Sequence, residues 1–152
     1  MSPASVRTGC TLEHIPAEAA VRSPLRRRGS RRTSSYDVGM ALDLFAGIPV
    51  SDYAVALAWY ERLLGSSPAF FPNETEAVWE LAEHRYIYIV LRPEQAGSAL
   101  HTVLVGDLDA RVAGIAGRGL EPTRRETYQG GMRKITYRDP DGNEFGFGGA
   151  QS

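Results

Sequence analysis

The feature of this sequence that most constrains its fold is a pattern that occurs twice. A Val-x-Asp triplet ends a strand-like run at Val50–Asp52 and again, 55 residues later, at Val105–Asp107. Each aspartate precedes a stretch with helical apolar periodicity, where its carboxylate can accept hydrogen bonds from the free N–H groups of the first helical turn. Gly65 and Gly119 lie where these two helices should end. The chain therefore contains two copies of a strand–helix unit.

Strand-like runs follow each expected helix. In the first copy they read AFF, AVWEL and YIYIVL, and in the second they read TRRETY, MRKITYR and NEFGFG. Three strands after one crossover helix give a mixed sheet with its helix on one face. We therefore expect an α+β protein of two βαβββ modules, residues 41–97 and 98–150, whose paired mixed sheets form a concave groove.

The first 40 residues differ in composition from the rest of the chain. They carry seven basic and three acidic side chains, whereas the remaining residues carry ten and fifteen. The segment RSPLRRRGSRRTSS has no helical or strand periodicity and few large apolar side chains, so burial cannot offset its ordering entropy. We therefore expect residues 1–40 to be a disordered Arg/Ser-rich tail, and residues 41–150 to be the folded domain.

Charge and cysteine content limit the classes of function. The mildly acidic folded part argues against a nucleic-acid interface, and no apolar run approaches the roughly 18 residues that a membrane helix needs. The single cysteine, Cys10, excludes an internal disulfide and a cysteine-rich metal site, and it is consistent with a reducing cytoplasm. No glycine-rich phosphate loop or serine nucleophile elbow is present. We expect a cytoplasmic protein with no nucleic-acid or membrane partner.

Two motifs together resemble those of a known family. They are PVSDYAVALAWYERLLG (49–65) and the closing YRDPDGNEFGFG (137–148). In the second, Pro140 fixes φ and Gly142 can adopt positive φ, as a hairpin turn requires. Both are similar to motifs of the vicinal oxygen chelate superfamily, which includes glyoxalase I, bleomycin-resistance proteins and extradiol dioxygenases. The resemblance covers about residues 41–149, and it leaves function open because the fold hosts several chemistries and some plain binding proteins.

The resemblance implies a test for a divalent metal. Metal-using members typically offer one ligand, usually histidine, from the first strand of each module and one glutamate from the last. The corresponding positions here include Phe45, Leu100 and Gly146, which cannot bind a metal through their side chains. His101 and Glu144 lie close to these positions and could serve only after a bulge or a shift along the strand. We therefore expect no cofactor, with a divalent metal at His101 and Glu144 as the alternative.

Aromatic side chains are abundant on the predicted strands. Pockets lined by aromatic residues with a few polar groups are the usual form of a small-molecule site. Arginine and glutamate can bind charged or hydroxylated groups of a ligand, and a glycine leaves space for it. The predicted ligand-binding residues are Phe45, Trp79, Tyr86, Tyr88, Tyr137, Arg133, Glu144 and Gly146.

Three functions follow from these observations. The first is a protein that binds a small organic molecule in an aromatic-lined groove without the usual metal. The second is a divalent-metal-dependent enzyme of the lyase or dioxygenase type, and the third is an interaction domain whose groove is filled by its own side chains. Exposed sheet edges would favour a homodimer, whereas a single chain with two modules could also close its own groove. The sequence leaves open whether the protein is an enzyme.

Overall fold

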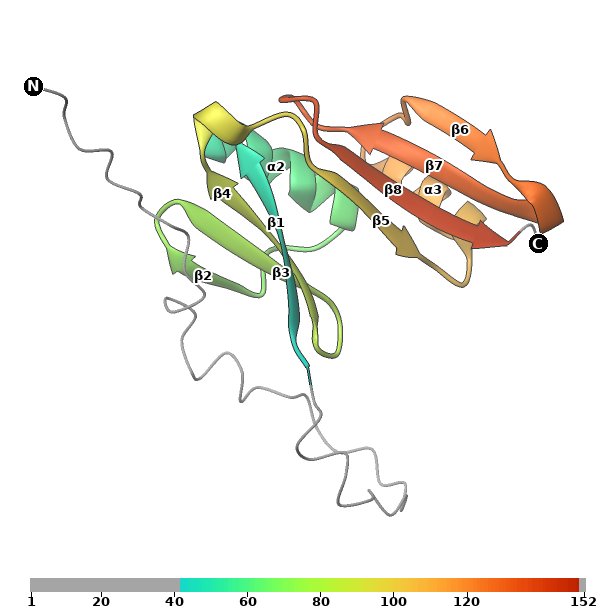
Figure 1. Cartoon of the computed structure of the whole chain (residues 1–152), viewed down its shortest axis with the longest axis horizontal. Helices are drawn as coiled ribbons and strands as arrows, with labels where there is room; N and C mark the ends of the chain where they lie inside the picture. The colour runs from blue at the N-terminus through green and yellow to red at the C-terminus, as the bar shows by residue number, and fades with distance from the viewer. Residues whose placement is uncertain (1–41, 151–152) are drawn as a thin grey trace, which may run out of the picture.

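The computed structural model describes residues 42–150, which form two four-stranded sheets with two α-helices (Figure 1). The first module consists of β1 (Leu44–Val50), α2 (Tyr53–Leu64), β2 (Phe70–Asn73), β3 (Glu76–Ala82) and β4 (Arg85–Leu91). After the 3₁₀ turn η2 (Pro93–Gln95), the second consists of β5 (Leu100–Leu104), α3 (Leu108–Gly117), β6 (Arg124–Thr127), the 3₁₀ turn η3 (Gln129–Gly131), β7 (Met132–Arg138) and β8 (Glu144–Ala150). The prediction of two βαβββ modules is confirmed, and the predicted tail (1–40) lies outside the described residues.

The two sheets have the same topology. The strand order is β1-β4-β3-β2 in the first sheet and β5-β8-β7-β6 in the second. In each sheet the first strand of the module pairs in parallel with the last strand, and the other pairings are antiparallel. Strands β1 and β5 are consequently edge strands.

The pairing register shows which residues of the two modules are equivalent. Phe45 pairs with Tyr86 in the first sheet, and Leu100, which is 55 residues after Phe45, pairs with Glu144 in the second. Tyr86 and Glu144 are therefore equivalent, as are the five residues that precede each of them. We call these segments the first turn (Leu81–Arg85) and the second turn (Asp139–Asn143).

Both helices begin and end as the sequence predicts. The side chain of Asp52 accepts a hydrogen bond from Val55 N at 3.1 Å, and Asp107 accepts one from Ala110 N at 2.9 Å. Gly65 ends α2 in a left-handed conformation with φ 75°, which glycine adopts without strain. The helices have 12 and 10 residues, and none in the described part of the chain is long and apolar enough to cross a membrane.

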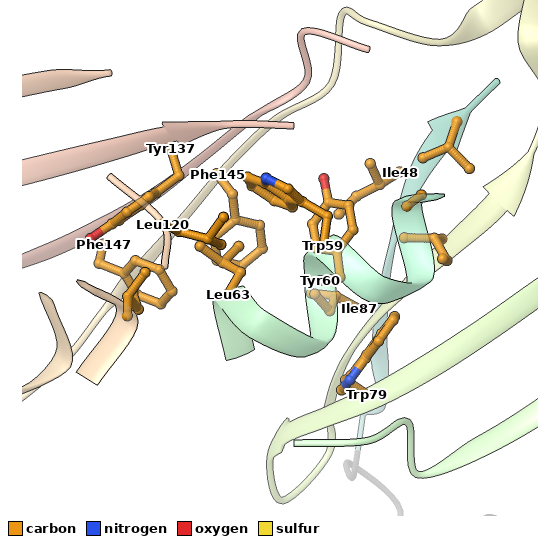
Figure 2. Close-up of a cluster of buried hydrophobic side chains, with 14 of the residues drawn as sticks. Ile48, Trp59, Tyr60, Leu63, Trp79, Ile87, Leu120, Tyr137, Phe145 and Phe147 are labelled. Atoms are coloured by element: carbon orange, nitrogen blue, oxygen red, sulfur yellow. The ribbon is translucent and has the colours of Figure 1, made fainter. Parts of the chain in front are cut away.

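Helix α2 lies between the two sheets and joins their apolar faces into one core. Tyr60 and Leu63 of this helix are completely buried. The side chains around them form one contiguous cluster, in which Figure 2 labels Ile48, Trp79 and Ile87 from the first sheet, Leu120, and Tyr137, Phe145 and Phe147 from the second. Each sheet therefore turns its other side, which we call its outer face, away from the shared core.

Candidate functional site

The second turn is a polar latch between the modules. Asp139 and Asn143 are almost fully buried, at 5% and 1% exposure. Asp139 Oδ2 accepts a hydrogen bond from the Tyr60 hydroxyl at 2.8 Å, and Asn143 Nδ2 donates to the Pro49 carbonyl at 2.8 Å. Both partners belong to the first module. This end of the module junction is thus held by directional bonds between buried groups, which are stronger than exposed ones.

Two further contacts reinforce the latch. The Ser51 backbone N–H donates to Asp141 Oδ2 at 2.9 Å, and the Ser51 hydroxyl also donates to this carboxylate. Burial, and then the negative charge of Asp139, raise the pKa of Tyr60 well above its usual range. The Tyr60 hydroxyl therefore remains protonated, and remains a donor, across the physiological pH range.

The first turn lacks this latch. Its contacts are local, because Leu44 N donates to the His84 carbonyl at 2.9 Å and His84 Nδ1 lies 2.6 Å from the Asp43 carboxylate. Within residues 42–150, no hydrogen bond or ion pair joins Leu81–Arg85 to the second module. The equivalents of the latch residues are Leu81 for Asp139, Glu83 for Asp141, Arg85 for Asn143, Ile115 for Tyr60 and Gly106 for Ser51.

A cavity of about 620 Å³ lies at this unlatched end of the junction. Its wall includes the first turn from one module and the segment that leads into α3 from the other. The volume is within the range of roughly 300–1,000 Å³ that small-molecule sites occupy. Lining residues that bear on function are Trp79, Leu81, Arg85 and Tyr86 from the first module, and His101, Gly106, Arg111 and Phe147 from the second.

The cavity wall offers polar groups that the protein itself does not use. Both ring nitrogens of His101 are buried and have no hydrogen-bond partner within the described residues. The Arg111 guanidinium carbon lies 5.6 Å from the centroid of the Phe147 ring, a cation–π contact. A buried polar group without a partner costs about 1–3 kcal/mol. Because the His101 nitrogens are closed to solvent, a ligand would reach them only after a shift of the ring.

Four of the predicted ligand-binding residues belong to the first sheet, and two of these line the cavity. Trp79 and Tyr86 are part of the cavity wall, and Trp79 Nε1 donates to the Ser66 carbonyl at 3.0 Å. Phe45 lies on the outer face, where its ring stacks on Tyr86 at 4.5 Å with an interplanar angle of 8°. The ring of Tyr88 covers the bare backbone of Gly47 on the same face.

The other four predicted residues belong to the second sheet, outside the cavity. Glu144 and Gly146 are on its outer face, where Arg124 and Arg138 bond Glu144 and lower its pKa. On the opposite face, Arg133 binds Asp109 of α3 through two hydrogen bonds of 3.0 and 2.9 Å. Tyr137 is 1% exposed and belongs to the core. The structure thus does not bring the eight residues into one site.

The model of one protein family covers most of the described chain. Residues 41–147 match the Glyoxalase/Bleomycin resistance protein/Dioxygenase superfamily. The chain belongs to this superfamily. No curated protein matches the sequence.

Several solved structures are similar to this chain. A glyoxalase/bleomycin resistance protein from Catenulispora acidiphila DSM 44928 is 55% identical, with a TM-score of 0.71 over 73% of this chain and 100% of that one. A bleomycin-binding protein in complex with bleomycin is 17% identical, with a TM-score of 0.60 over 73% and 100% of the two chains. Lactoylglutathione lyase from Agrobacterium tumefaciens is 16% identical, with a TM-score of 0.58 over 72% and 93%. The last two show a shared fold only.

The residues of this superfamily member do not fit a divalent metal. Because Leu100 pairs with Glu144 and strand side chains alternate, His101 points to the opposite side of the sheet from Glu144. Glu144 is moreover engaged by two arginines. Among residues 42–150, no three His, Cys, Asp or Glu side chains are grouped closely enough to hold a metal ion. Divalent ions in proteins need several such ligands around one point.

Sequence reasoning missed the part of the cavity wall that comes from the module junction. Arg111, Gly106 and Phe147 carry no motif, and their role depends on how the second module packs against the first. A signal was nevertheless present in the repeat. Aligning LAEHR (81–85) with DPDGN (139–143) shows that Leu81 and Arg85 replace the buried Asp139 and Asn143 of the other junction.

Proposed function

We propose that this superfamily member binds a small organic molecule in the cavity between its two modules, without a metal ion. The observation that carries the proposal is the cavity of about 620 Å³ at the unlatched junction. Its wall combines aromatic and aliphatic side chains, among them Tyr86 and Leu81, with the charged side chains of Glu80, Arg85 and Arg111. Apolar surface beside well-placed polar groups is typical of small-molecule sites.

Binding rather than catalysis is favoured by the chemistry of the side chains. The positions at which metal-using members place ligands hold Phe45, Leu100 and Gly146, so a Lewis-acid centre has no support there. The solved complex of a bleomycin-binding protein has the same fold, which supports capture of a small molecule as a use for it. The metal-dependent lyase or dioxygenase is the second candidate, and the cytoplasmic location stays a prediction from the sequence.

Blocking the cavity tests the proposal. Gly106 lines it, and a Cβ added there meets no atom within 4 Å, so Gly106→Trp adds bulk without a clash in the fold. Gly117 at the end of α3 also has open space but does not line the cavity, which makes Gly117→Trp the matched control. The probe is N-phenyl-1-naphthylamine, a neutral dye that fluoresces in apolar sites.

We expect the dye to bind the wild type and the Gly117→Trp variant equally, and to bind Gly106→Trp at least about tenfold more weakly. At a dye concentration 100 times Kd, the wild type should gain about 2.7 kcal/mol in the free energy of unfolding. Absence of dye binding, or equal binding by both variants, would overturn the proposal. A third outcome, tightly held Zn²⁺ or Fe²⁺ in protein purified without chelator, would favour the metalloenzyme.

A homodimer is also part of the proposed function. Edge strands β1 and β5 carry exposed apolar side chains, with Leu44 at 64%, Leu100 at 73% and Leu104 at 71% exposure. Proteins rarely leave an apolar sheet edge uncovered, because it pairs with other chains. We expect light scattering to give the mass of two chains, and Leu100→Lys, which lies outside the cavity, to give that of one. A monomeric wild type would contradict the dimer.

A further inference from the structure

We infer that the ligand of this cavity is an organic anion, with its acidic group bound by Arg85 of the first module and Arg111 of the second. The inference rests on the proposed function, because it names the chemical class that the same cavity takes. It follows from the charges on the wall, from the aromatic surface beside them, and from the equivalence of the two turns.

The charged side chains of the wall favour a negative ligand. Arg85 and Arg111 both line the cavity, and within residues 42–150 neither forms an ion pair. By contrast Arg124, Arg133 and Arg138 are each bonded to a carboxylate. An arginine presents a planar set of N–H donors that matches carboxylate, sulfonate or phosphate oxygens. Two such groups on the wall of one cavity favour an anionic ligand.

The acidic residue of the wall is already engaged. Glu80 lies beside Tyr86, whose pKa is raised by burial and then by the charge and hydrogen bond of Glu80. This carboxylate is therefore directed at a tyrosine hydroxyl of its own sheet. The wall as a whole, with two arginines and one glutamate, carries a net positive charge even when His101 is neutral.

The remaining wall offers aromatic surface beside the arginines. Tyr86 of the first module is half-buried, and Arg111 of the second is held over the Phe147 ring rather than by a carboxylate. A guanidinium stacked in this way keeps its N–H edge free for a ligand. An aromatic carboxylate or sulfonate combines these features.

At the latched end of the junction, the protein itself pairs a carboxylate with hydrogen-bond donors from both modules. There the carboxylate of Asp139 accepts hydrogen bonds from Tyr60 and Asn143 and joins the modules. At the unlatched end Arg85 stands in the position of Asn143, so a donor is present, but Leu81 replaces Asp139 and supplies no acceptor. A bound anion would provide the missing acceptor. We therefore expect the ligand to stabilise the module junction as well as to be captured by it.

The test compares two dyes that differ in one group. They are 8-anilinonaphthalene-1-sulfonate and N-phenyl-1-naphthylamine, which has the same rings without the sulfonate. We expect the wild type to bind the sulfonate about tenfold or more tightly than the neutral dye, and Arg85→Gln and Arg111→Gln each to remove most of that preference. Arg125→Gln makes the same charge change at an exposed residue outside the cavity and should have no effect.

The outcomes separate this inference from the proposed function. If the neutral dye binds and is blocked by Gly106→Trp, while the sulfonate binds no better and ignores both arginine substitutions, the cavity binds ligands but the anion inference is wrong. If neither dye binds, or Gly106→Trp affects neither, both proposals are overturned. Binding of the neutral dye to the arginine variants also reports that they are folded, so a loss confined to the sulfonate identifies the charge as the cause.

Discussion

The two modules share one element order but meet each other differently at their two turns. Asp139 and Asn143 of the second turn are buried and bonded to β1 and α2, whereas the first turn (Leu81–Arg85) bonds to its own module and, within residues 42–150, to nothing in the other. One junction is thus sealed by protein groups, and the equivalent one is a cavity. An internal repeat can therefore create a cavity without a dedicated motif, because a contact made at one end and missing at the other leaves a space between the modules.

The outer faces of the two sheets also differ, because one is aromatic and the other carries charged side chains. On the first sheet Phe45, Tyr86 and Tyr88 form an aromatic surface. On the second, Gly146 is covered by the stem of Lys134, and the ion pairs of Glu144 lie nearby. The core lies between the two faces. Tyr86 of the first face and Thr102 of the second nevertheless reach the wall of the cavity at the junction.

The largest expected effect comes from removing the centre of the latch. The Asn143 side chain bonds the Pro49 carbonyl, the Asp139 carboxylate and the backbone N–H groups of Gly97 and Ala99. Asn143→Ala therefore leaves several buried groups without a hydrogen-bond partner. We expect a loss of about 3–5 kcal/mol in the free energy of unfolding, measured in urea.

The matched control is Asn73→Ala, at an exposed turn with bonds only to Thr75, where the loss should stay below about 1 kcal/mol. Equal losses for the two asparagines would mean that the second turn is not a latch.

A smaller effect is expected at the hydroxyl of the latch. Tyr60→Phe removes the donor to Asp139 and should cost about 1–3 kcal/mol. Since the folded-state pKa of Tyr60 is raised, its contribution is present below the ordinary tyrosine pKa of about 10 and is lost at higher pH. Tyr53→Phe, at a partly exposed bond of 3.2 Å to the Glu76 carbonyl, is the comparison and should cost less. A larger loss of stability for Tyr53→Phe than for Tyr60→Phe would contradict the claim that the buried hydrogen bond contributes more.

A carboxylate introduced at Leu81 of the first turn should make the unlatched junction resemble the latched one. Leu81→Asp places an acidic group at the position equivalent to Asp139, beside the arginines of the cavity. We expect it to weaken sulfonate dye binding by about tenfold through competition for these arginines. Leu81→Asn loses the same apolar contacts without adding charge, and should retain the preference for the sulfonate. Similar binding by both variants would argue against an anion site.

The smallest expected effect lies at the exposed first turn. A hydrogen bond with Asp43 raises the pKa of His84. The pair therefore stabilises the fold below the ordinary histidine pKa of about 6.5, and this contribution is lost as pH rises through the higher folded-state pKa. We expect His84→Gln to remove a small rise in urea midpoint between pH 8 and pH 5.5. An unchanged pH profile would show that the pair contributes nothing.

The fold was predictable from the sequence because its signals are local. Asp52 and Asp107 as caps, and Gly142 with φ 99° in the closing turn, are determined by neighbouring residues. The site was predictable only in part. The pairing of Trp79 with Ile87 places Trp79 and Tyr86 on opposite faces of the sheet, and neither this register nor the face that meets the other module can be read from the sequence. Both reach the cavity, since it lies where the sheet ends at the junction.

An NMR titration of the backbone amides with the sulfonate dye tests the central claim most directly. If the dye binds at the unlatched junction, the largest chemical-shift changes should occur at Gly106, Arg111 and Leu81, which line the cavity from both modules. Changes confined to the outer faces, at Phe45 and Tyr88 or at Gly146, with the cavity amides unmoved, would contradict it.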